Sequence, residues 1–544
     1  MKKKIDRLLR TGVIVFLQRY LLIVCFAIVI SVWSFRLLDL QYRSINLPRA
    51  YTSDAIAQQV ILHDWQEGYK ESATMGEDSW FIKFPLYIIS NNLPISPVKK
   101  LFITSIIILA ITLLLVLISL QRFLKSLNIS EKRRRLSLVA SSMLLAAVPT
   151  TTFFVFQFPN SRNIEIGLFL LILVELHRYF VFKNTYKTHK RLKVLGLVLL
   201  SAVLLANDPL FLYLFAIPAA LFCCGYLIFC SKSHEVKLKS LLALSLLSIV
   251  LGKVLAYILT IVLPITYIIH NSKFATFDVF LVNIKVFFNN AINIFGINFW
   301  GNKYASTGTL KAFLFICLLM ISIYGIITMA KKYKSAPING LIAFLATFTI
   351  VVFLVGTDFS IGTDSLSGRF LILLFPIQIL GLVYALAYLK NLRIVAVALL
   401  CLVVVFVQTL ASTGRAVLQN RHARVNALDA VPLQVITENN LTKGYAPYSR
   451  SATLTYSSNF KVHVISSECS LQDKQMYFSS VLTEKANLRR TSDKSFYIYD
   501  SLRPYDCKPE DLLNLLGIPE KTIPLPMGEV LNIYNYDITP KIKR

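Results

Sequence analysis

The sequence predicts an α-helical polytopic membrane protein of about eleven transmembrane helices with a small soluble α/β domain at its C-terminal end. Hydrophobic residues fill 55% of the 544 positions and charged residues only 16%, a balance too apolar for a water-soluble surface. Apolar stretches that could cross a hydrocarbon core of about 30 Å recur along the chain. From Leu418 the pattern changes to short β-like runs separated by polar turns.

The apolar stretches define eleven predicted spans. They lie near 18–38, 101–120, 136–157, 164–182, 193–207, 209–230, 238–266, 310–330, 338–356, 369–389 and 393–413. The stretch at 193–207 is short and ends at Asn207, Asp208 and Pro209, so we expect it to stop inside the membrane plane. We assign residues 1–413 to a transmembrane domain and residues 414–544 to a soluble domain.

Basic clusters predict the orientation of these spans. They occupy alternate loops, at 1–10, 121–135, 183–193, 232–239, 331–334 and 390–393. This positive-inside pattern predicts a cytoplasmic N-terminus and places the opposite loops and the C-terminal domain outside the cytoplasm. The net charge of +28 gathers between apolar runs rather than on one continuous face, so we expect no nucleic-acid partner.

Two insertions on the predicted outer side are large. The first, 39–100, mixes polar and aromatic residues with helical stretches, and the second, 267–309, reads as an amphipathic interfacial segment that ends at Trp300. Its apolar stripe comprises Phe277, Phe280, Leu281, Ile284, Phe287 and Phe288. We expect the two insertions to frame a cavity at the outer leaflet; simple packing of the stripe on the membrane surface is the alternative.

The C-terminal region combines short predicted strands with two helical segments. The predicted strands are Ala452 to Tyr456, Lys461 to Ile465, Ser495 to Tyr499 and Val530 to Tyr534, and the helices lie near 425–439 and 508–516. Cys469 and Cys507 are the only cysteines of this polar region, and an oxidising compartment would allow them to form a disulfide.

Acidic residues recur on the predicted outer face, where ionisable groups at the edge of membrane helices are functional candidates. Asp54 follows the first span, and Glu77 and Asp78 come later in the same insertion. A carboxylate at this position could accept a proton from a hydroxyl nucleophile. We interpret these three acids as candidate catalytic bases; solvated loop acids are the alternative.

Basic residues on the same side are candidates for contacts with a phosphate. Lys83 precedes Phe84 and Pro85, Arg162 lies in the second outer turn, and Arg369 opens the span at 369–389. A guanidinium can make paired hydrogen bonds to phosphate oxygens, whereas interfacial snorkelling is the alternative for Arg369.

Two further acids would support these cations. Glu165 follows Arg162 by three residues, on one face if the helix has begun, so the two could form a structural salt bridge. Asp208 precedes Pro209 and suits a helix cap.

Nucleotide and metal chemistry have no support in the sequence. It contains no Walker loop and no dinucleotide fingerprint, and its cysteines show no metal-ligand spacing. We therefore expect no cofactor and no metal site, with a divalent metal left open. Acids and cations that meet at one membrane face suit a reaction in which a hydroxyl attacks a sugar carbon while a lipid phosphate departs.

These features together resemble the GT-C superfamily of polyprenyl-phosphate-sugar-dependent membrane glycosyltransferases. The resemblance rests on the cytoplasmic N-terminus, the acidic first outer loop, the turn from Ser161 to Glu165 and the pair Arg369-Phe370. It implies an enzyme of the bacterial cytoplasmic (inner) membrane that transfers a monosaccharide from a polyprenyl-phosphate donor. The implied acceptor is a cell-envelope glycan such as an O-antigen.

The resemblance also implies roles for particular residues. Asp54 matches the position of the superfamily's first-loop catalytic acid, but it lacks the adjacent acid of the common Asp-Glu form, so Glu77 and Asp78 stay as alternatives. The C-terminal domain looks like the tail of bacterial members, which implies acceptor recognition. Four tyrosines there could stack on sugar rings or be buried in the core: Tyr445, Tyr448, Tyr456 and Tyr477.

Two other functions compete with this interpretation. A polysaccharide polymerase or ligase would share the helices and the outer arginines but would use a lipid-diphosphate-linked glycan. A non-enzymatic transporter or flippase would carry charges near the bilayer middle, where Lys253 is the clearest candidate.

Overall fold

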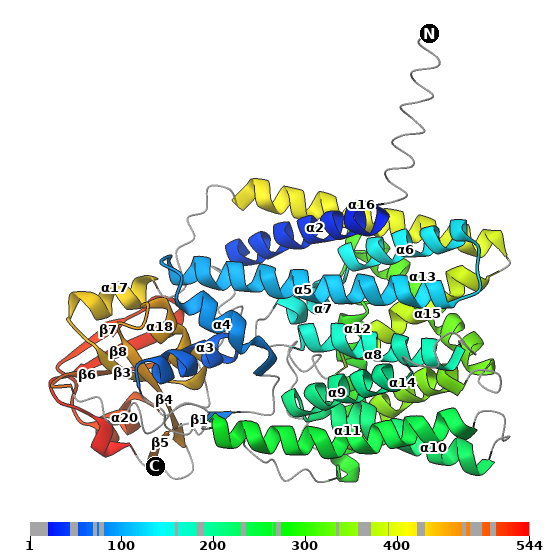
Figure 1. Ribbon diagram of the computed structural model, residues 1–544. Coiled ribbons are helices and arrows are strands. Elements are labelled where there is room, and N and C mark those ends of the chain that lie inside the picture. Colours follow the sequence, from blue (N-terminus) through cyan, green and yellow to red (C-terminus); the bar gives the residue numbers. More distant parts are fainter. Residues whose placement is uncertain are drawn as a thin grey trace.

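A computed structural model describes most of the chain, including the helix bundle and the C-terminal domain (Figure 1). The described residues are 20–43, 53–68, 73–75, 81–157, 162–181, 190–229, 235–263, 265–267, 274–332, 337–356, 371–389, 391–420, 430–470, 475–478, 492–500 and 508–542. They form a bundle of long helices with a small sheet domain at one end. A polytopic helical architecture with a C-terminal α/β domain is thus confirmed in outline.

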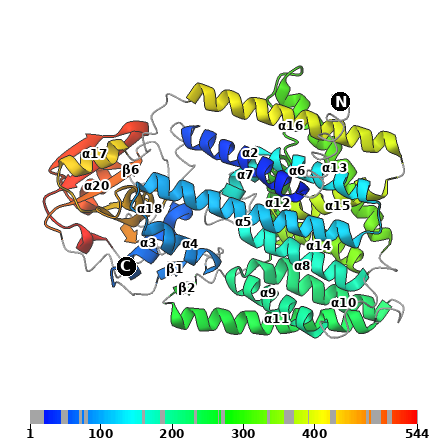
Figure 2. The same cartoon turned by 45° about the horizontal axis from the view of Figure 1, so that its top comes forward.

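Seven helices in the described ranges are long and apolar enough to cross a membrane. They are α2 (Leu21–Arg43), α5 (Pro97–Ser126), η2 (Leu212–Ala216) continued by α10 (Ile217–Phe229), α11 (Glu235–Val262), α13 (Thr307–Lys331), α14 (Pro337–Val355) and α16 (Leu392–Asn420). The helices α2 and α16 pack together at one edge of the bundle, and α10 and α11 pack together at the opposite edge (Figures 1 and 2).

In the described part of the chain, seven of the roughly eleven predicted spans reach this length and composition, and the four other ranges show what sets them apart. These ranges hold α6 (Glu131–Ala146) with α7 (Thr150–Gln157), α8 (Asn163–Val181), α9 (Lys190–Asn207) and α15 (Leu374–Tyr388). The predicted span at 136–157 is split in two, and α8 carries the charges of Glu165, Glu175 and Arg178. The apolar parts of α9 and α15 are shorter than a full span.

The break between α6 and α7 is stabilised by side chains from α2. The last carbonyls of a helix lack partners inside the helix, and here Trp33 Nε1 donates to the Leu145 carbonyl at 2.8 Å. Arg36 Nη1 donates to the Val148 carbonyl at 2.7 Å, and its guanidinium lies 4.2 Å from the Phe153 ring centroid. A buried arginine in an apolar helix thus serves to join α2 to the broken segment.

The second insertion contains an amphipathic helix, as predicted. The helix α12 (Phe277–Ile294) begins at Thr276, whose side chain accepts a hydrogen bond from the Val279 amide. Phe277 and Phe288 are exposed while Val286 is buried against the bundle. A short parallel pairing of β1 (Ala73–Met75) with β2 (Ile265–Tyr267) joins the first insertion to the segment that leads into the second.

The C-terminal domain is a six-stranded mixed sheet covered on both faces by helices. Its strands, in sheet order, are β5 (Gln475–Phe478), β4 (His463–Ser470), β3 (Lys443–Ala446), β6 (Ser495–Asp500), β8 (Glu529–Tyr534) and β7 (Lys521–Pro524). Alternate residues face opposite sides: Tyr497 packs with α20 (Pro509–Leu516), whereas Phe496 packs with α17 (Ala430–Glu438) and α18 (Tyr448–Ser457). The strands predicted at 461–465, 495–499 and 530–534 and both predicted helices are confirmed.

The prediction of a strand from Ala452 to Tyr456 is wrong, because this segment forms α18. The neighbouring strands β3 and β4 pair in parallel, and parallel neighbours need a crossover connection, usually a helix. Within α18 the Thr455 hydroxyl donates to the Ser451 carbonyl at 3.1 Å and accepts from the Val464 amide of β4 at 3.0 Å. Threonine is common in strands, but here the Thr455 side chain joins the crossover helix to the sheet.

The first insertion lies between the helix bundle and the C-terminal domain (Figure 1). Its helices are α3 (Ser53–Gln66) and α4 (Phe84–Asn91), and α3 packs directly on α18. We call this end of the bundle the domain end. We call the opposite end, where Lys132 to Arg135 open α6, the basic end, and α5 runs from one to the other.

Candidate functional site

Four of the predicted site residues meet in one cluster near the domain end. Lys83 ends the short helix η1 (Phe81–Lys83) of the first insertion, Arg162 and Glu165 lie at the start of α8, and Asp208 follows α9. Each of the four side chains is almost fully shielded from solvent. We call these four residues, with Asn207, the buried charge cluster.

Lys83 and Glu165 form the first ion pair of the cluster. Lys83 Nζ lies 3.3 Å from Glu165 Oε2, and both side chains have 0% exposure. Asn207 Nδ2 donates to Glu165 Oε1 at 2.9 Å, and the Ile82 amide donates to Asn207 Oδ1 at 3.0 Å. The pair and the asparagine therefore connect the first insertion to the facing ends of α8 and α9.

Arg162 and Asp208 form the second pair. Arg162 Nε donates to Asp208 Oδ2 at 2.5 Å, and Nη2 donates to Oδ1 at 3.3 Å, the paired geometry that favours guanidinium–carboxylate binding. The Leu210 amide donates to the same Asp208 Oδ1 at 3.0 Å. Asp208 thus caps the turn after α9, as predicted, and also neutralises a buried cation.

The electrostatics of the cluster follow from its burial. Two cations face two carboxylates, so the set is close to neutral, which is the condition under which buried charges are tolerated. Burial lowers the pKa of Lys83, and the nearby Glu165 carboxylate opposes that change. Burial also raises the pKa of Asp208, against the effect of Arg162, and raises the pKa of Tyr87, in the same direction as the Glu165 charge.

This arrangement is suited to holding elements together. Lys83 and Arg162 were predicted to contact a donor phosphate, but their charges are directed at carboxylates inside the protein. Separating either buried pair would leave an uncompensated charge. The cluster therefore fixes the first insertion against α8 and α9, and contact of these cations with a phosphate stays a prediction.

Of the three candidate catalytic acids, only Asp54 lies within the described residues. Asp54 is the second residue of α3 and thus belongs to the helix between the bundle and the C-terminal domain. Glu77, Asp78 and Arg369 lie outside the described residues. Cys469 on β4 is disulfide-bonded, while Cys507 falls outside the described ranges, so its pairing with Cys469 stays a prediction.

The predicted sugar-stacking tyrosines are largely core residues. Tyr445 and Tyr456 are buried in hydrophobic clusters, and the Tyr445 hydroxyl is hydrogen-bonded to Thr539. Their rings are therefore not open to a sugar. Tyr477 on β5 is only partly buried, and its hydroxyl donates to Gln475 Oε1 at 2.8 Å. The side chain of Tyr448 is not among those that the structure describes.

A second polar region, not predicted from the sequence, lies between the first insertion and the C-terminal domain. Lys100 Nζ donates to the Asn91 carbonyl at 2.8 Å and to Asn459 Oδ1 at 3.3 Å. The rings of His63 and Phe460 stack with centroids 3.6 Å apart. Lys100 stands at the predicted outer start of a span, against the positive-inside pattern, and this departure is the signal that could have identified it.

Metal ligation finds no support in the described part of the chain. There, no group of three or more histidine, cysteine, aspartate or glutamate side chains is arranged to hold a metal ion. The buried carboxylates of Glu165 and Asp208 are occupied by Lys83 and Arg162 instead.

Comparisons with known proteins do not place the chain in a family. No protein-family model matches it, and a search of curated proteins finds no relative. The function must therefore be argued from the residues and their arrangement.

Proposed function

We propose that this protein is a membrane glycosyltransferase that moves a monosaccharide from a polyprenyl-phosphate donor to a cell-envelope glycan on the extracytoplasmic side of the bacterial inner membrane. The observation that supports it most is the position of α3. This helix carries Asp54 and lies between the apolar bundle and the C-terminal domain. A base that activates an envelope-glycan acceptor for attack on a lipid-anchored donor would stand at such a boundary.

The orientation in this proposal comes from the charges. The basic end carries Lys132 to Arg135 and, by the positive-inside rule, faces the cytoplasm. The domain end then faces the opposite compartment, where the disulfide at Cys469 is chemically favoured.

The proposed reaction is a displacement at the anomeric carbon. Asp54 takes the proton of an acceptor hydroxyl, the acceptor oxygen forms a bond to the anomeric carbon, and the bond between that carbon and the donor phosphate oxygen breaks. The polyprenyl phosphate leaves with both bonding electrons. Arg369 would neutralise its charge.

The buried charge cluster supports this chemistry indirectly. Catalytic groups act efficiently only when the structure beneath them is held in place. Lys83 and Asn207 tie the first insertion to α8 and α9, and α18 packs on the other side of that insertion. The described parts of the first insertion, among them the helix α3 that carries Asp54, are therefore attached to rigid elements on both sides.

The test is transfer of a radiolabelled sugar from a short synthetic polyprenyl-phosphate donor to envelope glycan, with the purified protein in proteoliposomes. Asp54→Asn should reduce incorporation by about a hundredfold or more, the usual contribution of a general base. Asp278→Asn changes an exposed acid at the start of α12 and should leave incorporation unchanged. Normal activity in Asp54→Asn would exclude Asp54 as the base and direct attention to Glu77→Gln and Asp78→Asn.

The product distinguishes the competing functions. Addition of a single sugar supports the proposal, whereas a change in polymer length with a diphosphate-linked donor would indicate a polymerase or ligase. Movement of the lipid substrate across the proteoliposome membrane without covalent change would indicate a transporter.

A further inference from the structure

The start of α5 packs against α18 of the C-terminal domain, and three lysines belong to this junction (Figure 1). Lys100 bridges it, because its Nζ donates to the Asn91 carbonyl at 2.8 Å and to Asn459 Oδ1 at 3.3 Å. Lys99 precedes Lys100 on α5, and Lys461 lies two residues after Asn459 in the turn before β4. The chain therefore keeps both of them near Lys100. We call Lys99, Lys100 and Lys461 the lysine junction.

The positive charge of the lysine junction is not neutralised within the described residues. There, none of the three lysines pairs with a carboxylate. Glu67 follows α3 near this turn, but its carboxylate lies 3.1 Å from His63 Nε2. Lys99 and Lys461 are exposed, whereas Lys100 is only 5% exposed. A buried ammonium without a counter-charge is unfavourable, and two further cations raise the positive potential nearby. The junction therefore favours an anion.

Asn91 adds an acceptor beside Lys100. Its side chain is almost fully buried and donates from Nδ2 to the Gln59 carbonyl at 2.9 Å. Its Oδ1 has no hydrogen-bond partner within the described residues. This combination suits a ligand that carries a hydroxyl group beside its negative charge, because the hydroxyl donates to Oδ1 while the ammonium binds an anionic oxygen. An acidic sugar has both groups on one ring.

The lysine junction faces the water-exposed side of the proposed active site. Asn459 and Lys461 belong to the C-terminal domain and are exposed. The ring of His63 on α3 stacks on Phe460 of the same turn, with centroids 3.6 Å apart. Asp54 precedes His63 by nine residues on this helix, which corresponds to about 13 Å along its axis. An oligosaccharide of a few units can reach from the junction to Asp54.

We propose that the lysine junction binds a carboxylate of the acceptor, and that the acceptor is an acidic glycan. This inference rests on the proposed function, because it gives the chemical class of the acceptor in that reaction. Lys100 binds the carboxylate of a sugar acid, and Asn91 Oδ1 accepts a hydrogen bond from a hydroxyl of the same ring. Lys99 and Lys461 attract the polymer from water. An anionic lipid headgroup would approach from the membrane and leave Lys461 of the soluble domain unused.

Binding is measured without donor, by isothermal titration calorimetry on the full-length protein in detergent. The probes are trigalacturonate, its methyl ester, which has the same rings without the charges, and glycerophosphoglycerol, the soluble form of an anionic lipid headgroup. Trigalacturonate should bind about tenfold more tightly than the ester, as expected for hydrogen bonds to a charged group. The preference should shrink as the salt concentration rises, because Lys99 and Lys461 are exposed.

Two double variants make the result specific. Lys99→Gln/Lys461→Gln changes only exposed side chains, so it should keep the unfolding midpoint and lose most of the preference for the charged trimer. Lys508→Gln/Lys521→Gln removes two exposed charges at the start of α20 and on β7, and should keep the preference. Equal binding of trimer and ester, an equal loss in the control, or tighter binding of glycerophosphoglycerol than of the trimer would each overturn the proposal.

Failure of this inference and failure of the proposed function give different results. Sugar transfer by a protein that binds trimer and ester equally would overturn the inference and leave the proposed function. Charge-selective binding that Lys99→Gln/Lys461→Gln abolishes, without any transfer from the polyprenyl-phosphate donor, would overturn the proposed function and leave a binding site for acidic glycans.

Discussion

At the residue scale, the buried carboxylate of Asp208 has two structural roles. It accepts hydrogen bonds from Arg162 and from the Leu210 amide, so it neutralises a cation and caps a turn at once. Asp208→Asn keeps an acceptor for Leu210 but removes the charge opposite Arg162. We expect a loss of about 3–5 kcal/mol in the free energy of unfolding, the usual cost of an uncompensated buried charge.

Thermal unfolding of the purified protein in detergent measures this loss. The matched control is Glu235→Gln, which breaks an exposed pair with Lys239 spaced four residues along α11. That change should cost only about 0.3–0.5 kcal/mol. Similar shifts of the unfolding midpoint in the two variants would contradict a structural role for the buried charge cluster.

The lowered pKa of Asp537 leads us to expect that the C-terminal domain loses stability in acid. Burial opposes its ionisation, but hydrogen bonds from Thr539 and Lys443 outweigh that effect and hold its pKa below the ordinary value. The unfolded chain therefore binds the proton more tightly, so this contribution to stability is present above about pH 4 and is lost as pH falls below it. Asp537→Asn should flatten this part of the curve of unfolding midpoint against pH. Parallel curves for the two proteins would contradict the assignment.

The residues of the buried charge cluster were predictable as candidates, but their partners were not. The spacing of Arg162 and Glu165 suggested a pair on one helix face. In the structure α8 begins only at Asn163, so Arg162 precedes the helix and turns to Asp208, while Glu165 turns to Lys83. Both partners come from other elements, Lys83 from the first insertion and Asp208 from the turn after α9, and spacing within α8 carries no information about them.

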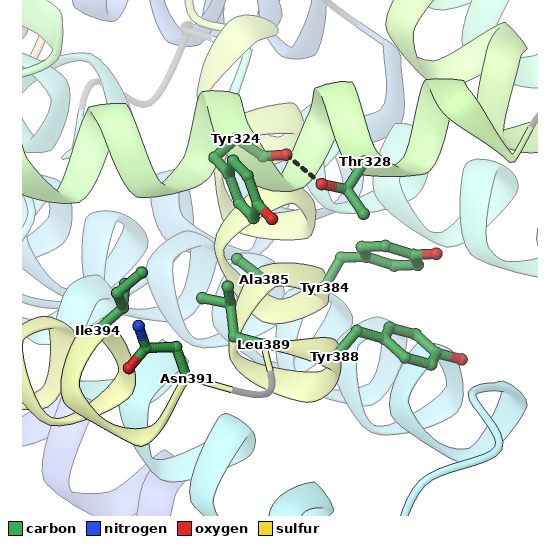
Figure 3. Close-up of a pocket in the computed structure, with 8 residues that line it drawn as sticks. All are labelled: Tyr324, Thr328, Tyr384, Ala385, Tyr388, Leu389, Asn391 and Ile394. Carbon is green, nitrogen blue, oxygen red and sulfur yellow. Dashed lines mark hydrogen bonds between the residues drawn. The ribbon is translucent and has the colours of Figure 1, made fainter.

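At the scale of elements, two glycines determine how α13 and α15 pack. A Cβ added to Gly325 would lie 1.9 Å from the Gly381 carbonyl oxygen, and one added to Gly381 would lie 2.4 Å from the Ser322 carbonyl oxygen. The backbones therefore meet directly, the arrangement that small residues allow between membrane helices. The same two helices line a groove at the basic end (Figure 3).

Alanine at either glycine should separate these helices. We expect Gly325→Ala and Gly381→Ala each to cost about 1–3 kcal/mol or more, as for overpacked interiors. Gly196→Ala on α9 is the control, because a Cβ there meets nothing within 4 Å. Thermal unfolding in detergent would compare the three variants. The expectation fails if Gly381→Ala unfolds at the same temperature as the unaltered protein.

The long elements were predictable, but their connections were not. Long apolar stretches in the sequence located α5, α11, α13 and α16, because lipid-facing and buried surfaces both require apolar residues there. The strand predicted at 452–456 failed because its threonines favour strands locally, whereas the parallel pairing of β3 with β4 requires a helix at that position. Contacts between distant strands cannot be read from local composition.

For the whole molecule, the decisive arrangement is that the C-terminal domain and the basic turn lie at opposite ends of α5. Lys100 near the start of α5 reaches Asn459 of the domain, and Arg133 beyond its other end reaches Ala387. If α5 crosses the membrane once, these two ends face different compartments. In the orientation that we propose from the positive-inside rule, the basic end faces the cytoplasm.

Labelling of single introduced cysteines in spheroplasts tests this topology. Ile518→Cys replaces a residue of the C-terminal domain that is 84% exposed, and Lys132→Cys replaces an exposed residue at the basic end. A membrane-impermeant maleimide should modify Ile518→Cys in intact spheroplasts and Lys132→Cys only after permeabilisation, relative to the unaltered chain with its native cysteines. The reverse pattern would place Asp54 in the cytoplasm, away from an extracytoplasmic acceptor, and the proposed function would fail with the topology.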